Sequence, residues 1–165
     1  MCNGASLPEI ISMWGTISLS SAVLHVIDIM SNKVITVDVS NTAYDAVTKM
    51  LRRDVGSVVV KKDGKVVGII TKGDVLRKAV KPGLDPKKVN AENVMSKPVV
   101  TVDQNATLEE ASQLMAKKNV SKLPVLKDGE LVGIITSSDI IRAEPMQVGY
   151  LQELIKARYV PHELR

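Results

Sequence analysis

One short segment occurs twice in this chain, and its repetition restricts the folds that the sequence can adopt. The segment Gly68–Asp74, with the pattern Gly-Ile-Ile-Thr-x-x-Asp, recurs 65 positions later as Gly133–Asp139. In both copies an apolar run ends at a threonine, which predicts a buried strand. An aspartate follows three residues later and predicts the first turn of a helix. The repeated unit is therefore a strand that ends in a hydroxyl and leads into a helix with a carboxylate at its start.

The similarity between the copies extends well beyond this segment. The matched stretches include Met30-Ser31 with Met95-Ser96, Thr36-Val37-Asp38 with Thr101-Val102-Asp103, and Lys62-Asp63-Gly64 with Lys127-Asp128-Gly129. About 20 of about 50 positions between Asp28 and Arg77 are identical without a gap, which is the level of similarity found between structural repeats. Because two copies are too few for a solenoid, we expect a pseudo-twofold pair that shares one core.

Each copy predicts the element order β-α-β-β-α. In the first copy we expect strands at 34–37, 56–60 and 66–71, a helix that begins after a Thr42/Asp45 capping box, and a short helix at 74–80. The second copy predicts strands at 99–102, 120–126 and 131–136 and a helix that begins near Thr107. Asp-Gly pairs at 63–64 and 128–129 predict tight hairpin turns. Pro124 replaces Val59, and proline is expected at a sheet edge or a strand end.

The predicted fold class is α/β (α+β), with two tandem repeats related by a pseudo-twofold axis. The expected organisation is an N-terminal arm at 1–25, repeat one at 26–80, a linker rich in proline and glycine at 81–90, repeat two at 91–143 and a C-terminal tail at 144–165. The tail predicts one more amphipathic helix at 147–159, whose apolar face consists of Val148, Leu151, Leu154 and Ile155.

Composition limits the classes of function. Hydrophobic residues make up 45% of the 165 residues but aromatic residues only 2%, so the core must consist of Val, Ile, Leu, Ala and Met. The single cysteine, Cys2, excludes an internal disulfide and a cysteine-based zinc site, and it suits a cytoplasmic location. The net charge of +4 comes from scattered lysine and arginine pairs, so nucleic acid is not an expected partner. The apolar run near residues 22–30 is too short to span a membrane.

The motifs at both ends of the unit resemble a known family. Asp-Ile-Met-Ser at 28–31 or Asn-Val-Met-Ser at 93–96 opens each copy, and Gly-Ile-Ile-Thr-x-x-Asp closes it. This arrangement resembles the CBS domain pair, also called the Bateman module, over about residues 26–143. The resemblance implies a stand-alone regulatory module that binds AMP, ADP, ATP, S-adenosylmethionine or NAD. It also implies a homodimer in the form of a flat, four-repeat disc, which acts on a protein target that the sequence does not identify.

The resemblance also implies two ligand sites, each built from both repeats. The terminal aspartate would hold the ribose hydroxyls, the threonine three residues before it would bind ribose or phosphate, and apolar residues of the other repeat would enclose adenine. One cleft would comprise Ile134, Thr136, Ser138 and Asp139 with Val34, Ile35, Val55 and Val58, and the other Ile69, Thr71 and Asp74 with Val99, Val100, Val120 and Leu123. The nearest cations in sequence, as candidates for phosphate, are Lys72, Arg77, Lys97 and Arg142. The two copies differ at two matching positions near these motifs. Gly73 of the first copy matches Ser138 of the second, and Lys33 of the first copy matches Pro98 of the second.

The chemistry of these residues supports the same interpretation. An ionised carboxylate has two oxygens that can accept the two O–H groups of a cis-diol. The alternative is that Asp74 and Asp139 only cap helices and that the threonines only end strands. Binding and capping are compatible with each other.

We predict a module that is not an enzyme and needs no catalytic cofactor or metal. His25 and His162 have no evident catalytic partner, and no phosphate-binding loop or metal-ligand spacing is present. The preferred ligand is AMP, ADP or ATP. The alternatives are a sensor of S-adenosylmethionine or NAD, and an adaptor for protein or nucleic acid whose clefts are structural. For a homodimer, the candidate interface residues are Val47, Met50, Leu51, Leu114 and Met115.

Overall fold

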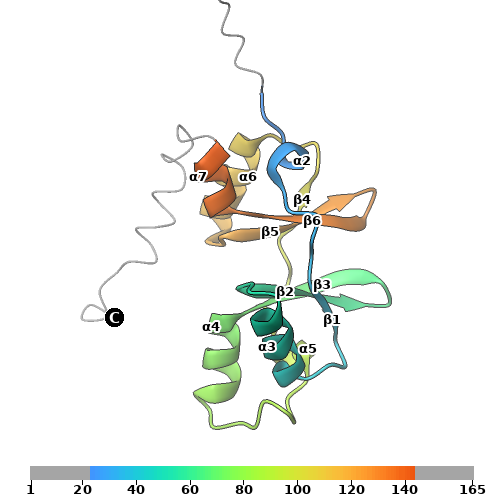
Figure 1. Ribbon diagram of the computed structural model, residues 1–165, viewed down its shortest axis with the longest axis vertical. Coiled ribbons are helices and arrows are strands. Elements are labelled where there is room, and N and C mark those ends of the chain that lie inside the picture. The colour runs from blue at the N-terminus through green and yellow to red at the C-terminus, as the bar shows by residue number, and fades with distance from the viewer. Residues whose placement is uncertain (1–22, 144–165) are drawn as a thin grey trace, which may run out of the picture.

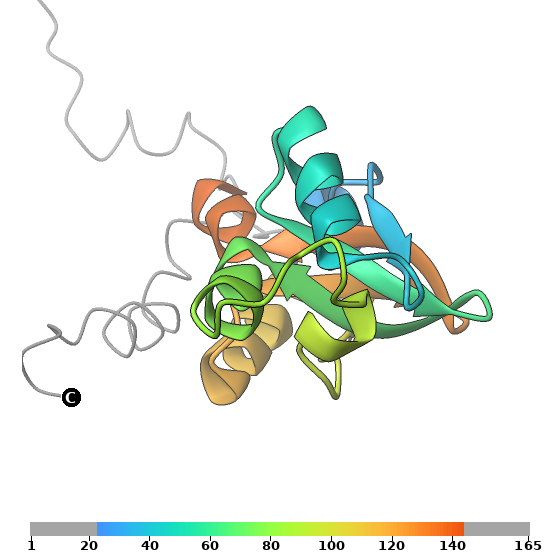
Figure 2. The ribbon, with the colours of Figure 1, turned by 90° about the horizontal axis from the view of Figure 1, so that it is seen from below.

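The two repeats form two halves that stack on each other (Figure 1). The computed structural model describes residues 23–143, so most of the predicted arm and all of the predicted tail helix lie outside the described residues. Each half contains one three-stranded sheet, with strand order β1-β2-β3 or β4-β5-β6. The two sheets face each other at the centre and the helices lie at the two ends (Figure 1). Seen from below, the helices of repeat one lie in front of its strands (Figure 2). The predicted fold class is therefore confirmed.

Repeat one follows the predicted order closely. Its elements are α2 (Val26–Ile29), β1 (Thr36–Asp38), α3 (Ala43–Arg52), β2 (Ser57–Lys62), β3 (Lys65–Thr71), α4 (Lys72–Val75) and the π-helical turn η1 (Leu76–Val80). Strand β1 is parallel to β2, and β2 is antiparallel to β3. The predicted capping box of α3 is present, with Thr42 and Asp45 bonding each other's backbone N–H groups. Asp63 and Gly64 have φ of 51° and 81°, the positive values that a tight hairpin turn requires.

Repeat two has the same topology with one difference at its first strand. Its elements are α5 (Ala91–Val94), β4 (Val102–Asp103), α6 (Leu108–Lys118), β5 (Lys122–Lys127), β6 (Glu130–Thr136) and α7 (Ser137–Ala143). In repeat one the N–H of Val59 donates to the carbonyl of Ile35 at 2.9 Å. Pro124 occupies the matching place in β5 and has no N–H to donate. Strand β4 accordingly begins at Val102, one position later in the repeat than β1. Pro124 lies inside the central strand, so its expected place at an edge or strand end is wrong.

The short first helix of each repeat, α2 or α5, packs against the other repeat instead of its own. The sequence did not predict this exchange. Helix α2 precedes repeat one in sequence but packs beside α7 and β6 of repeat two, and α5 packs with α3 and β3 of repeat one (Figure 1). Val26 is fully buried in the core of repeat two, whereas Ala91 and Val94 are fully buried in that of repeat one. Each half therefore depends on a segment that belongs to the other repeat.

The glycine that opens each repeated motif makes this exchange possible. A Cβ atom on Gly68 would collide with the side chain of Met95, and one on Gly133 would collide with that of Met30. Both methionines follow the exchanged helices. Backbone bridges join the same segments, since Ser31 pairs with Ile134, and Ser96 pairs with Ile69 in the same way. The motif glycines therefore provide the space in which the two halves interlock.

Candidate functional site

A cleft lies between the repeats where the segment that follows α2 crosses β6. Its volume is about 190 Å³. It is lined by Ser31, Lys33, Val34, Ile35, Val55, Gly56, Ser57, Lys122, Ile134, Thr136 and Asp139. Residues 31–57 come from repeat one and residues 122–139 from repeat two. The structure therefore brings together six of the eight residues predicted for this cleft. We call this cleft the Asp139 cleft.

The Asp139 carboxylate uses only one of its oxygens inside the protein. Oδ2 accepts the backbone N–H of Thr136 at 3.0 Å and the Thr136 hydroxyl at 2.6 Å. Within residues 23–143 no hydrogen bond reaches Oδ1, and its nearest cation is the exposed Arg142 at 4.0 Å. The side chain of Asp139 is 29% exposed. One ionised oxygen is thus fixed by Thr136 while the other remains able to accept a donor from a ligand.

Thr136 has a positioning role in this geometry. Its hydroxyl donates to Asp139 Oδ2 and accepts the backbone N–H of Asp139 at 3.3 Å. The hydroxyl hydrogen is therefore already used, and Thr136 orients the carboxylate instead of offering its own donor to a ligand. Ser138 is exposed on α7 and does not line the cleft.

Four of the residues that line the cleft are apolar. Val34 and Ile35 lie just before β1, Val55 lies just before β2, and Ile134 lies in β6. Val58, which was predicted with them, is fully buried in the core of repeat one and does not line the cleft, because alternate residues of β2 point to opposite faces of the sheet. The cleft thus combines several apolar side chains with one carboxylate.

Two lysines in the Asp139 cleft were missed by sequence reasoning. Lys33 and Lys122 line it, and the Lys122 side chain lies close to Gly56, within 3.8 Å of where a Cβ atom would sit. None of the four predicted cations lines this cleft. Lys72 lines a groove elsewhere, Arg77 lies beside Asp74, Lys97 is 3.9 Å from Glu92, and Arg142 is 80% exposed beside Asp139. The cations were predicted from closeness in sequence, whereas the crossing of the two repeats brings Lys33 and Lys122 together.

The pseudo-symmetric position around Asp74 is built differently. The Asp74 side chain is 4% exposed, and its Oδ1 accepts the Ser96 hydroxyl at 3.0 Å. Burial by itself raises the pKa of Asp74, but hydrogen bonds from Thr71 and Ser96 and the charge of Lys78 outweigh it and hold the pKa below its usual value. Of the apolar residues predicted here, Ile69, Val99, Val100 and Val120 are half-buried, and Leu123 is fully buried in the core of repeat two.

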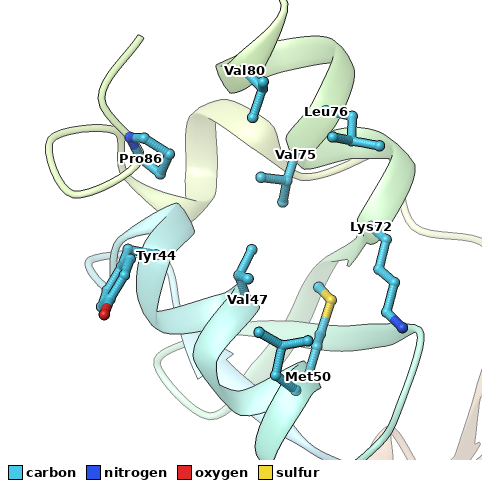
Figure 3. Close-up of a pocket in the computed structure, with 9 residues that line it drawn as sticks. Tyr44, Val47, Met50, Lys72, Val75, Leu76, Val80 and Pro86 are labelled. Atoms are coloured by element: carbon cyan, nitrogen blue, oxygen red, sulfur yellow. The ribbon is translucent and has the colours of Figure 1, made fainter.

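A second concavity lies on the helical face of repeat one (Figure 3). It has a volume of about 390 Å³, and it is almost wholly apolar. Its lining residues come from α3, α4, η1 and the following loop: Tyr44, Val47, Met50, Leu51, Lys72, Val75, Leu76, Val80 and Pro86. Leu51 is 69% and Leu76 is 59% exposed. We call this surface the apolar groove.

The described residues offer neither a metal site nor a membrane span. Among residues 23–143 no group of three or more His, Cys, Asp or Glu side chains is placed to hold a metal ion. No helix within the same range is both long and apolar enough to cross a bilayer.

Comparison with known families agrees with this architecture. The model of the CBS domain matches residues 26–81 and again residues 91–145. The chain belongs to the CBS domain family. CBS domain pairs are regulatory ligand-binding modules. The two halves described above are therefore a CBS pair, with the exchanged helix α2 inside the first match and α5 inside the second.

Relatives of this CBS pair are found in several organisms, among them Methanopyrus kandleri and Bacillus subtilis. A protein of Methanopyrus kandleri is 37% identical over 131 residues, which are 78% of this chain and 67% of that protein. The CBS domain-containing protein YhcV of Bacillus subtilis is 34% identical over 113 residues, which are 68% of this chain and 80% of that protein.

Solved structures share the same fold. The CBS domain pair of protein MJ0100, in complex with 5′-methylthioadenosine and S-adenosyl-L-methionine, has a TM-score of 0.66 and 30% identity, covering 73% of this chain and 95% of that chain. A hexameric CBS-CP12 protein from bloom-forming cyanobacteria has a TM-score of 0.68 and 32% identity, covering 73% of this chain and 67% of that chain.

Proposed function

We propose that this CBS pair is a regulatory module without catalytic activity that binds an adenosine-containing ligand in the Asp139 cleft, with AMP, ADP or ATP preferred. The observation that carries the proposal is the Asp139 carboxylate. Thr136 fixes one oxygen, and within the described residues no hydrogen bond reaches the other. A ribose cis-diol offers O–H donors that this oxygen can accept, and hydrogen bonds to a charged group are the stronger kind.

The other residues of the cleft suit the remaining parts of a nucleotide. The apolar wall of Val34, Ile35 and Val55 offers a slot for a flat base, and no aromatic side chain lines the cleft. Recognition of adenine would therefore rest on shape and on backbone groups. Lys33 and Lys122 supply positive charge for a phosphate. A basic hollow lined by Lys49, Arg52 and Arg53 shares Val34 and Ile35 with the cleft and extends the cationic surface.

A second candidate ligand class is S-adenosylmethionine or 5′-methylthioadenosine. The observation in its favour is that the related CBS pair at 30% identity was solved with both compounds. The two cleft lysines argue for a phosphate-bearing ligand instead, because the sulfonium of S-adenosylmethionine is itself a cation and 5′-methylthioadenosine has no anionic group.

Titration calorimetry with a panel of compounds tests the proposal. We expect AMP, ADP or ATP to bind, CMP to bind much more weakly, and 2′-deoxy-AMP to bind at least about tenfold more weakly than AMP, since about 1.4 kcal/mol corresponds to a factor of ten. Equal affinity for AMP and 2′-deoxy-AMP would contradict the role given to Asp139. If none of AMP, ADP, ATP, NAD, S-adenosylmethionine and 5′-methylthioadenosine binds, the chain is an adaptor whose clefts are structural.

A substitution of Lys33 distinguishes a phosphate-bearing ligand from S-adenosylmethionine or 5′-methylthioadenosine. Lys33→Met keeps the apolar stem and removes the charge. For a phosphate ligand, this variant should bind AMP at least about tenfold more weakly, because a hydrogen bond to a charged group contributes roughly 1.5–3 kcal/mol. The affinity for 5′-methylthioadenosine should stay unchanged in the same variant. If both affinities stay unchanged, Lys33 does not contact the phosphate.

We further propose that the CBS pair forms a homodimer through the apolar groove and that ligand binding changes the shape of the dimer or its affinity for a protein target. Leu51 and Leu76 are the most exposed of the large hydrophobic residues in the groove. The matching positions in repeat two are Ala116 and Ile141, and Glu109 replaces Tyr44, so the apolar surface is concentrated on repeat one. A twofold axis would bring two such grooves together. Of the five candidate interface residues, Met50 and Met115 are buried in the two cores.

A further inference from the structure

Asp74 ends the first copy of the repeated motif but has both of its carboxylate oxygens occupied. Thr71 donates its backbone N–H to Oδ2 at 2.9 Å and its hydroxyl at 2.6 Å, the same geometry that holds Asp139. In contrast to Asp139, Oδ1 of Asp74 accepts the Ser96 hydroxyl at 3.0 Å and lies 3.4 Å from Arg77 Nη2. The oxygen that could accept a ligand donor at Asp139 is therefore already paired at Asp74.

Lys78 adds a contact that has no counterpart in the other half. Its Nζ lies 3.7 Å from Asp74 Oδ1 and donates to the carbonyls of Val94 and Met95 at 3.0 and 2.7 Å. These carbonyls close the end of the exchanged helix α5. One ammonium group thus joins the carboxylate of repeat one to the segment that leads into repeat two. The position that matches Lys78 in repeat two holds Ala143, which has no group that could reach Asp139 or the end of α2.

The cations that surround the two aspartates also differ between the two repeats. Lys33 and Lys122 both line the Asp139 cleft. On the side of Asp74 the position of Lys33 holds Pro98. Lys122 extends over Gly56, which is part of the Asp139 cleft. Two lysines therefore line the cleft at Asp139, whereas Arg77 and Lys78 lie within 3.7 Å of Asp74 Oδ1 and balance the charge of that carboxylate.

We infer that the two positions have diverged: the chain binds one ligand, in the Asp139 cleft, and Asp74 with Lys78 forms an internal latch that fastens the exchanged helix α5 to repeat one. The inference rests on the proposed function for its ligand. A ribose diol at Asp74 would have to displace the Ser96 hydroxyl and compete with Lys78 for the same oxygen. Lys78 therefore takes the place of a ligand at this position and makes the pseudo-symmetric module functionally asymmetric.

Stoichiometry measured by calorimetry with AMP tests the asymmetry. The parent chain should bind one AMP. Asp139→Asn should lower the affinity at least about tenfold, while the matched Asp74→Asn should change it less than about twofold. Lys78→Ala, which introduces the residue of the matching position, should leave only Ser96 and Arg77 beside Asp74 Oδ1. Their counterparts Ser31 and Arg142 also lie at the Asp139 cleft or beside Asp139, so this variant should add a second, weaker binding event. Two bound AMP molecules in the parent, or one in Lys78→Ala, would overturn the inference that Lys78 closes this site.

The latch can be measured without any ligand, so its failure is separable from failure of the proposed function. A double-mutant cycle in chemical unfolding compares Asp74→Asn, Lys78→Met and the double variant. We expect the double variant to lose clearly less stability than the two single losses combined, because either change alone breaks the same contact. Additive losses would show that Asp74 and Lys78 do not interact, even if AMP binds at Asp139. A parent that does not bind AMP but shows coupling would overturn the ligand assignment and leave the latch intact.

Discussion

At the scale of single residues, the two motif aspartates share one contact and differ in the other. Thr71 and Thr136 hold one oxygen of their aspartates in nearly the same way. The remaining oxygen is paired at Asp74, whose side chain is 4% exposed, but accepts no hydrogen bond from the described residues at Asp139, whose side chain is 29% exposed. Sequence comparison finds the shared part, because it is encoded by Thr and Asp three positions apart. It does not find the whole difference, because Ser96 and its counterpart Ser31 are both serines, yet within the described residues only Ser96 donates to its aspartate.

The Asp74 contacts predict a pH-dependent contribution to stability. Its pKa is lowered in the folded chain, although burial opposes this, because Thr71 and Ser96 hydrogen bonds and the Lys78 charge favour the ionised form. This contribution is present above the unfolded pKa of about 3.9 and is lost as pH falls through the lower folded pKa. Asp74→Asn should therefore cost about 1–3 kcal/mol at pH 7.

Urea unfolding of the parent and of Asp74→Asn at pH 7 and at pH 3 measures this contribution. The difference in free energy of unfolding should shrink at the lower pH. The matched control is Asp139→Asn, whose amide oxygen can still accept the Thr136 N–H and hydroxyl, so that stability should change little. A difference that is as large at pH 3 as at pH 7 would show that the ionised carboxylate is not what stabilises this position.

At the scale of elements, the sequence predicts the helices, strands and hairpins within each repeat because their signals are local. The capping boxes at Thr42 and Thr107 and the two Asp-Gly turns all occur where expected. The exchange of α2 and α5 could not be predicted in this way. A four-residue helix gives no periodicity, and only its packing against the other half determines its place.

The close contact between Gly68 and Met95 predicts that a substitution of Gly68 by alanine destabilises the packing between the two halves. Gly68→Ala would force the new methyl group against Met95, and overpacking of this kind costs about 1–3 kcal/mol. Gly56→Ala is the control, since its methyl group would meet only the flexible Lys122 side chain at 3.8 Å. Denaturant unfolding should show a lower midpoint for Gly68→Ala and little change for Gly56→Ala. Equal stability of the two variants would contradict the close approach of Met95.

At the scale of the whole molecule, an internal duplication has produced two halves with similar backbones and different surfaces. The apolar groove lies on repeat one, and the open carboxylate lies on the side of repeat two. The sequence predicts the duplication from its 65-residue displacement. It does not predict which candidate residues are exposed, since Met50 and Leu51 are neighbours in α3 but only Leu51 is exposed.

The asymmetry of the surfaces predicts where two copies meet. Leu51→Lys or Leu76→Lys would bury a charge in the proposed interface and should raise the dimer dissociation constant at least about tenfold. Gln113→Lys, on the exposed side of α6, is the control and should leave the dimer intact. Sedimentation velocity over a range of protein concentrations measures all three variants. A parent that stays monomeric throughout, or a Leu51→Lys variant that dimerises like the parent, would contradict the assignment.

The most direct test of the central claim is the affinity for AMP of Asp139→Asn compared with that of the parent chain, measured by titration calorimetry beside chemical unfolding without ligand. The amide oxygen of asparagine can still accept the Thr136 N–H and hydroxyl that Asp139 Oδ2 accepts, so the stability of the unliganded chain should be nearly unchanged. It has one acceptor oxygen and no charge, so binding to the ribose diol should weaken at least about tenfold. If the parent binds AMP and Asp139→Asn binds it equally well, Asp139 only caps its helix and the proposed site is wrong.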